Sequence, residues 1–156
     1  MPSAGGNTGK DFERYRQVDL DFHRTFSNAD HSPQLGEPMP GMLEGVKAIL
    51  ADDSRNKIII SCGGIGDYGE KIKAAFRVWL RHHGLPTNRF GFEDKPRTVA
   101  VIDDHALQFK GNNANEIWGE VLARLHRLDE KGPDVPLVGL PAKREAGSGG
   151  SATRAA

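Results

Sequence analysis

Three short apolar segments of this chain are each followed by side chains that could do chemistry. These side chains are Asp21, His23, Ser61, Cys62, Asp103 and Asp104. If the apolar segments are parallel strands, their carboxyl ends meet at one edge of a sheet, where ligand crevices form. Three carboxylates in one crevice repel one another, which raises a pKa or recruits a cation. Because carboxylate oxygens suit Mg²⁺, the pattern predicts an acidic crevice that holds this ion.

The Asp103-Asp104 pair also has a simpler interpretation. Taken alone, two adjacent aspartates are more typical of a solvated turn or a helix cap than of a metal site. The order of the surrounding elements decides how much weight the metal interpretation receives.

The hydrophobic periodicity predicts strands and helices that alternate along the chain. Short apolar runs predict strands at residues 16–22, 57–61, 88–92 and 98–102. Apolar residues spaced three and four apart predict helices at residues 41–51, 70–83 and 115–128. Gly84 and Pro86 follow the second of these helices as stop signals. This order predicts an α/β fold, a three-layer Rossmann-like parallel sheet with helices on both faces.

Length and composition restrict the class of protein. The 156 residues suffice for one domain, which we expect at residues 11–140 between disordered segments at 1–10 and 141–156. Lys and Arg together number 21, as do Asp and Glu, so the charge gives no strong signal for nucleic-acid binding. Cys62 is the single cysteine, which excludes an internal disulfide. Without an apolar run typical of a signal peptide or a membrane helix, a cytoplasmic protein is expected.

The order of the motifs resembles that of the haloacid dehalogenase (HAD)-like superfamily. VDLDFHRTF is similar to the strand of that family that ends in DxDGT, and KIIIS is similar to its strand followed by Ser or Thr. FEDKP resembles the part that carries a lysine, and VAVIDDHALQFKG resembles the acidic pair after a strand. The resemblance covers residues 18–111 and is greatest to short members without a large cap, related to phage-encoded and bacterial hydrolases.

The resemblance implies a Mg²⁺-dependent phosphomonoester hydrolase that forms an aspartyl-phosphate. Asp21 would be the nucleophile, His23 the acid and base, and Lys95 would screen charge at the site. The substrate-binding residues would be Ser61, Cys62, Gly63 and Arg24. The metal would be held by Asp21, by Asp103 or Asp104, and by the backbone carbonyl of residue 23. The open site would suit a large phosphorylated substrate or closure by a partner subunit.

Two residues of the first motif depart from the family pattern. His23 stands where the family has a second aspartate, and Arg24 stands where it has glycine. An imidazole can still shuttle protons near neutral pH, and an arginine can grip a phosphate. The alternative function is therefore a catalytically impaired, HAD-like pseudo-phosphatase that acts as a binding module. A second register of the motif makes Asp19 the nucleophile, although the spacing to the next proline-rich segment favours Asp21.

A glycine motif offers a further alternative, a dinucleotide-binding domain. Residues 64–69 read GIGDYG, a GxGxxG sequence between a predicted strand and a predicted helix, as the dinucleotide fingerprint requires. Glu93 or Asp94 would then hold a ribose hydroxyl, although both lie farther from the motif than usual. The other interpretation is a flexible glycine-rich turn whose backbone N–H groups can approach a phosphate.

Overall fold

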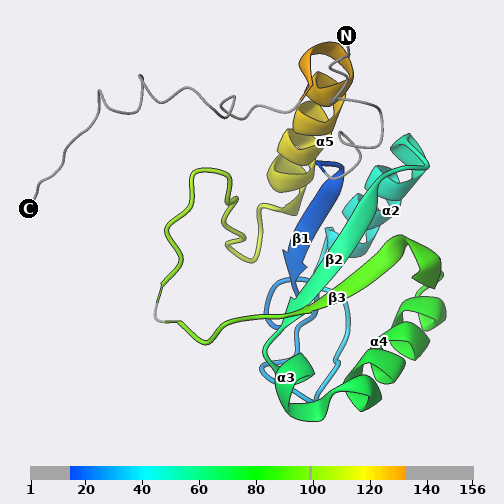
Figure 1. Ribbon diagram of the computed structural model, residues 1–156, viewed down its shortest axis with the longest axis vertical. Helices are drawn as coiled ribbons and strands as arrows, with labels where there is room; N and C mark the ends of the chain where they lie inside the picture. Colours follow the sequence, from blue (N-terminus) through cyan, green and yellow to red (C-terminus); the bar gives the residue numbers. More distant parts are fainter. Residues whose placement is uncertain (1–14, 99, 133–156) are drawn as a thin grey trace, which may run out of the picture.

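The computed structural model describes residues 15–98 and 100–132 (Figure 1). The segments expected to be disordered, 1–10 and 141–156, lie outside the described residues, as do both ends of the expected domain at 11–140. Within the described part, no helix is of a length and apolarity that would let it cross a membrane.

The described strands form one parallel sheet in the order β1-β2-β3. The strands are β1 (Gln17–Asp21), β2 (Lys57–Cys62) and β3 (Phe90–Asp94). Asp21 pairs with Ser61, and Ser61 in turn pairs with Glu93, so the three strands end together. The predictions of an α/β class, of a parallel sheet and of the first three strands are confirmed.

Three longer helices fall where the periodicity predicts them. They are α2 (Met42–Asp52), α4 (Glu70–His82) and α5 (Ala114–Lys131). Ile72, Phe76 and Leu80 are buried along α4, as their spacing requires. The chain leaves α4 through Gly84, which has a φ of 76°, and the Leu85 amide then donates to the Leu80 carbonyl at 2.9 Å. This turn is a glycine stop of the kind expected at that position.

Two short helical segments were not anticipated. The glycine motif forms α3 (Gly64–Tyr68), and η1 (Thr87–Arg89) is a 3-10 turn immediately before β3. An added Cβ on Gly64 would lie 2.1 Å from Ser32 Oγ, and one on Gly66 would lie 2.9 Å from Asp94 Oδ2. The segment expected to be a glycine-rich turn is therefore helical over Gly64–Tyr68, and it packs too closely for a side chain at Gly64 or Gly66.

The core lies against one face of the sheet. Leu20, Ile58 and Ile60 point to this face and are buried, together with Phe22 and Phe76. The opposite face carries the alternate residues of β1 and β2, and these are exposed or only partly buried: Gln17, Asp19, Asp21, Lys57, Ile59 and Ser61. A parallel sheet usually has both faces covered, so this face is unusually open among the described residues.

The strand predicted at 98–102 is not formed in the described part of that segment. Thr98 and residues 100–102 have no regular secondary structure, and residue 99 lies outside the described residues. In Figure 1 the chain swings away from the sheet after β3 and then turns back toward α5. Val101 is 70% exposed and Ile102 is fully exposed. The prediction of a strand is therefore wrong for the described residues of this segment, because an apolar pattern contains no information about which sheet edge would accept it.

The amino-terminal edge of the sheet is held by two arginines, Arg16 and Arg89. Arg16 is buried, donates to Asn56 Oδ1 at 3.0 Å and forms an ion pair with Asp129 of α5. Arg89 donates to the carbonyl oxygens of Leu50 at 3.0 Å and Asp53 at 2.8 Å, at the end of α2. These bonds satisfy carbonyl groups that a helix end otherwise leaves without partners.

Candidate active site

Asp21 is the last residue of β1, and both of its carboxylate oxygens have side-chain partners. Its Oδ1 accepts a hydrogen bond from Lys95 Nζ at 2.8 Å, and its Oδ2 accepts one from Thr25 Oγ1 at 2.9 Å. Lys95 continues from β3, where its amide donates to the Cys62 carbonyl at 3.3 Å. The structure therefore brings together Asp21 and Lys95, which are far apart in the sequence.

Ser61 lies beside Asp21 because the two residues are partners in the parallel pairing of β1 and β2. Both side chains belong to the open face of the sheet, and both are partly buried. Gly63 follows Cys62 directly, and an added Cβ there would lie 3.7 Å from the Lys95 carbonyl oxygen. Ser61, Gly63 and Lys95 thus line the carboxyl end of the sheet next to Asp21.

The choice between Asp19 and Asp21 has a structural basis. Asp19 lies inside β1, two residues before the end of the strand, whereas Asp21 lies at the end and contacts a cation and a hydroxyl. Burial raises the pKa of the Asp19 carboxyl above its ordinary value. The contacts of Asp21 with Lys95 and Thr25 at the carboxyl end of the strand favour the register that starts at Asp21.

A tight loop after β1 holds Arg24 in a left-handed conformation. The Phe26 amide donates to the Asp21 carbonyl at 3.2 Å, and the Arg24 amide donates to the Ala29 carbonyl at 3.0 Å. Arg24 has a φ of 60°, and it is the single non-glycine residue with a positive φ in the described part of the chain. Glycine adopts this conformation without strain, whereas an arginine does so at a cost. Arg24 is exposed.

Both ring nitrogens of His23 have protein partners. The Nε2 atom lies 2.8 Å from the Gln34 carbonyl oxygen. Because a carbonyl can only accept, Nε2 carries the proton and donates this bond. The Nδ1 atom lies 3.7 Å from Cys62 Sγ. A role as acid or base therefore requires the ring to release one of these partners.

Cys62 lies at the centre of a small buried cluster. Its Sγ is 3.2 Å from Ser32 Oγ and accepts a hydrogen bond from the Gly64 amide at 3.3 Å. The residue is 1% exposed. The thiol therefore packs beneath the crevice, behind His23, and is not open to a substrate in this conformation. The substrate-binding role of Cys62 therefore stays a prediction. Ser61, the other candidate of that motif, lies directly beside Asp21.

Asp103 and Asp104 lie on the loop between β3 and α5. Asp103 Oδ1 accepts a hydrogen bond from the His105 amide at 2.7 Å, which is a local turn of the kind considered above. The Asp104 side chain is exposed and lies 3.7 Å from His105 Nε2. Within residues 15–98 and 100–132, no three His, Cys, Asp or Glu side chains are grouped so that they could hold a metal ion. The predicted Mg²⁺ ligands are therefore not gathered in this conformation.

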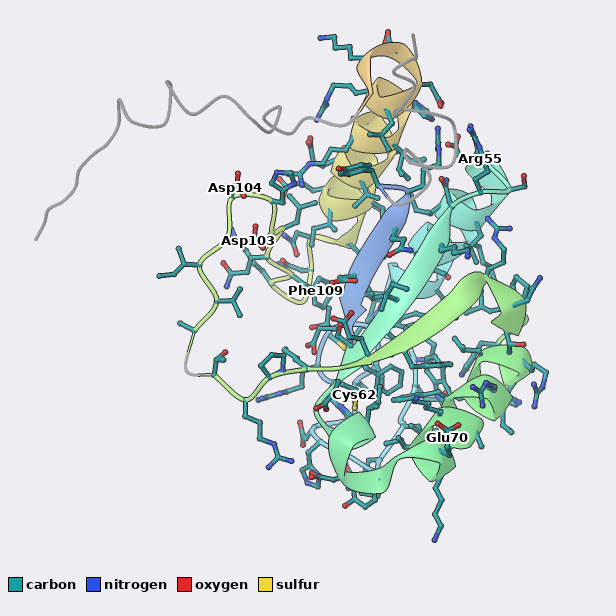
Figure 2. All side chains as sticks on the ribbon, in the orientation of Figure 1. Arg55, Cys62, Glu70, Asp103, Asp104 and Phe109 are labelled. Carbon is teal, nitrogen blue, oxygen red and sulfur yellow. The ribbon has the colours of Figure 1, made fainter. Side chains whose placement is uncertain are left out.

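A groove of about 890 Å³ nevertheless connects these carboxylates. It runs along the whole of β1, and Asp21, Thr25, Asp103 and Asp104 line it. Its apolar walls are formed by Met42, Leu107, Phe109, Ile117, Val121 and Leu125. In Figure 2, Asp103, Asp104 and Phe109 lie on the side of β1 opposite to β2. The groove thus offers an apolar surface that leads to Asp21.

The glycine motif is explained by packing within the chain. The Gly66 amide donates to Asp94 Oδ1 at 3.0 Å, so the carboxylate expected to hold a ribose is bonded to the motif itself. Gly64 is close to Ser32, as described above. These contacts account for Gly64 and Gly66, two of the three glycines of the motif, without a nucleotide.

Three contacts of the site were missed by the sequence analysis. The Thr25 hydroxyl on Asp21 had a signal, because the two residues belong to one motif. The contacts of Ser32 with Cys62 and of Gln34 with His23 had none, since they arise from the path of the loop.

Comparisons with protein-family models, with curated proteins and with solved structures found no match to this chain.

Proposed function

We propose that this protein is a phosphomonoester hydrolase that acts through an aspartyl-phosphate on Asp21 and uses Mg²⁺. The observation that carries the proposal is the contact of Lys95 with Asp21 at the carboxyl end of the parallel sheet. The lysine screens the charge of the carboxylate from an incoming phosphate dianion. The Thr25 bond orients the second carboxylate oxygen. The proposal includes a HAD-like, Rossmann-type fold with a second layer of helices.

In the first step a carboxylate oxygen of Asp21 attacks phosphorus, and the bond from phosphorus to the ester oxygen breaks. The leaving alkoxide takes a proton from an acid, for which His23 is the candidate. Ser61, which lies beside Asp21, and the Gly63 amide, which lies near Lys95, can donate hydrogen bonds to phosphoryl oxygens. In the second step water gives a proton back to His23 and attacks phosphorus, and the bond from phosphorus to the Asp21 oxygen breaks, which releases inorganic phosphate and restores the carboxylate.

The donor set for Mg²⁺ has suitable chemistry, because the candidate ligands are carboxylate oxygens. When bound, the ion would neutralise charge between the nucleophile and the phosphate. Asp21, Asp103 and Asp104 line one groove but are not grouped as a metal site in the described structure.

The test is the release of inorganic phosphate from a panel of phosphomonoesters, in Mg²⁺ and in EDTA. We expect metal-dependent turnover by the wild type and a loss of at least about a thousandfold in Asp21→Asn, which removes the nucleophile. Asp19→Asn is a matched control, since it makes the same change two residues earlier on the same face of β1. Equal losses in both variants, or turnover that survives in Asp21→Asn, would refute the assignment of the nucleophile.

A binding module without turnover is the second candidate function. Its specific support is His23, whose two ring nitrogens are both occupied by protein partners. A folded wild type that binds phosphate or vanadate in calorimetry but releases no phosphate between pH 5 and 9 would favour this candidate. Turnover in that range would exclude it.

A further inference from the structure

An ion pair between Arg97 and Asp67 lies beside the candidate active site. Arg97 belongs to the segment that follows β3, and Asp67 belongs to α3. The Arg97 guanidinium group donates a hydrogen bond to Asp67 Oδ2. The two side chains are 75% and 55% exposed, so a ligand from solution can reach both of them.

The position of Arg97 is fixed by contacts around Gly63, the residue that directly follows β2. An added Cβ on Gly63 would lie 3.7 Å from the Lys95 carbonyl oxygen and 4.0 Å from Arg97 Nε. The Gly66 amide donates to Asp94 Oδ1 at 3.0 Å, which ties α3 to the end of β3. The arginine therefore lies next to the carboxyl end of the sheet, where the proposed reaction takes place.

The segment after β3 presents two cations in the order Lys-Pro-Arg at residues 95–97. A residue before proline favours an extended backbone, and side chains two positions apart in an extended chain point to the same side. The two cations thus leave the backbone about 7 Å apart. Lys95 Nζ contacts Asp21, whereas Arg97 contacts a carboxylate that has no part in the proposed reaction.

The ion pair of Arg97 is of a kind that is readily exchanged. Pairs between exposed side chains contribute little to stability, because solvent screens the charges and the side chains lose conformational freedom. A guanidinium group uses the same planar fork of N–H donors to bind a carboxylate or a phosphate. The Asp67 carboxylate therefore occupies the place that an acidic group of a ligand would take.

We propose that Arg97 binds a second acidic group of the substrate and releases Asp67 when the substrate enters. The substrate class is then a phosphomonoester that carries a carboxylate or a further phosphate within reach of Arg97, while its reacting phosphate lies at Asp21 and Lys95. The inference rests on the proposed function for the reaction, but the binding of such a ligand requires no turnover. Arg97 is a specificity-determining residue, because it contacts the substrate away from the reacting atoms.

The test compares two ligands that differ by one carboxylate. They are the phosphonate analogues of 3-phosphoglycerate and of glycerol 3-phosphate, in which a methylene group replaces the ester oxygen and prevents hydrolysis. Calorimetry in Mg²⁺ gives the dissociation constant of each. We expect the wild type to bind the analogue with the carboxylate at least tenfold more tightly, because a charge-assisted hydrogen bond to Arg97 is added.

Three variants assign this preference to Arg97. Arg97→Gln should abolish it, whereas Arg81→Gln, which removes an exposed charge from α4, should retain it. Asp67→Asn should increase the preference about twofold to fivefold, because the competing carboxylate is removed. A weaker preference in Asp67→Asn would overturn the proposal, since Asp67 would then hold Arg97 in place instead of competing for it.

Two further results would also overturn the proposal. One is a wild type that binds both analogues equally or binds neither, and the other is a preference that survives in Arg97→Gln. A wild type that hydrolyses phosphomonoesters but shows no preference contradicts this inference alone. A wild type that shows the preference but releases no phosphate contradicts the proposed hydrolase alone.

Discussion

Arg24 allows the contributions of backbone and side chain at the site to be separated. An L-residue in the left-handed conformation costs about 1–2 kcal/mol, and Arg24 is held there at a φ of 60° by the bonds of its loop. Glycine removes this strain but loses about 0.5–1 kcal/mol in the entropy of the unfolded chain. We therefore expect Arg24→Gly to stabilise the protein by about 0.5–1 kcal/mol, which is roughly 2–4 °C in melting temperature.

Two further variants complete the series. Arg24→Asn should give a smaller gain, because asparagine tolerates the left-handed conformation better than other non-glycine residues. Arg24→Ala keeps the strain and should give no gain. Urea unfolding measures all three. A stabilisation by Arg24→Ala equal to that by Arg24→Gly would refute the reasoning, because relief of backbone strain could not then be the cause.

The same series tests the guanidinium group. If Arg24 grips the phosphate of the substrate, all three variants lose a charge-assisted hydrogen bond worth about 1.5–3 kcal/mol. The value of kcat/KM should then fall by about 10-fold to 100-fold in each variant, whatever its stability. A fall in Arg24→Gly alone would instead assign the effect to loop flexibility.

Three other predictions concern packing, charge and catalysis. Gly45→Ala places a Cβ 2.0 Å from Trp118 Cδ1, a clash that outweighs the gain in helix propensity. The net destabilisation, measured by urea unfolding, should be about 1–2 kcal/mol. Gly119→Ala, which has no atom within 4 Å of the new Cβ, should stabilise it by about 1 kcal/mol; the opposite order would contradict the α2–α5 packing. Asp19→Asn should stabilise the protein at pH 7, because the raised pKa of Asp19 makes its ionised form unfavourable in the fold. This gain should vanish below about pH 4, where the carboxyl is protonated in both the folded and the unfolded state. A gain in stability that does not depend on pH would exclude this cause. Lys95→Gln should lower kcat at least tenfold with little loss of stability, because its ion pair with Asp21 is partly exposed; a large loss of stability with unchanged kcat would make Lys95 structural.

Elements with a strong hydrophobic periodicity could be predicted from the sequence. Elements whose structure depends on contacts between distant segments could not. The stripe of Ile72, Phe76 and Leu80 is sufficient to identify α4. The segment at α3 contains two glycines and reads as a turn, because its helical form depends on contacts with Ser32 and Asp94. The strand expected at 98–102 has the right composition, but composition cannot specify a partner edge.

The site residues divide in the same way into those whose positions could be predicted and those whose positions could not. Asp21, Ser61 and Lys95 could be predicted to share an edge, because each follows or closes a strand and parallel strands end together. The environment of His23 could not, since the Gln34 carbonyl and the Cys62 thiol reach it only through the path of the loop. The position of Asp103 and Asp104 depends in turn on the segment whose pairing the sequence leaves open.

The two arginine clusters at the amino edge have a consequence for how this protein can change over evolutionary time. Arg16 and Arg89 tie the starts of the strands to the ends of α2 and α5, at the opposite end of the sheet from Asp21. Substitutions in the loop after β1 therefore leave the bonds of that end intact. An exchange of His23 or Arg24 changes the site itself while the scaffold retains its anchoring at the other end.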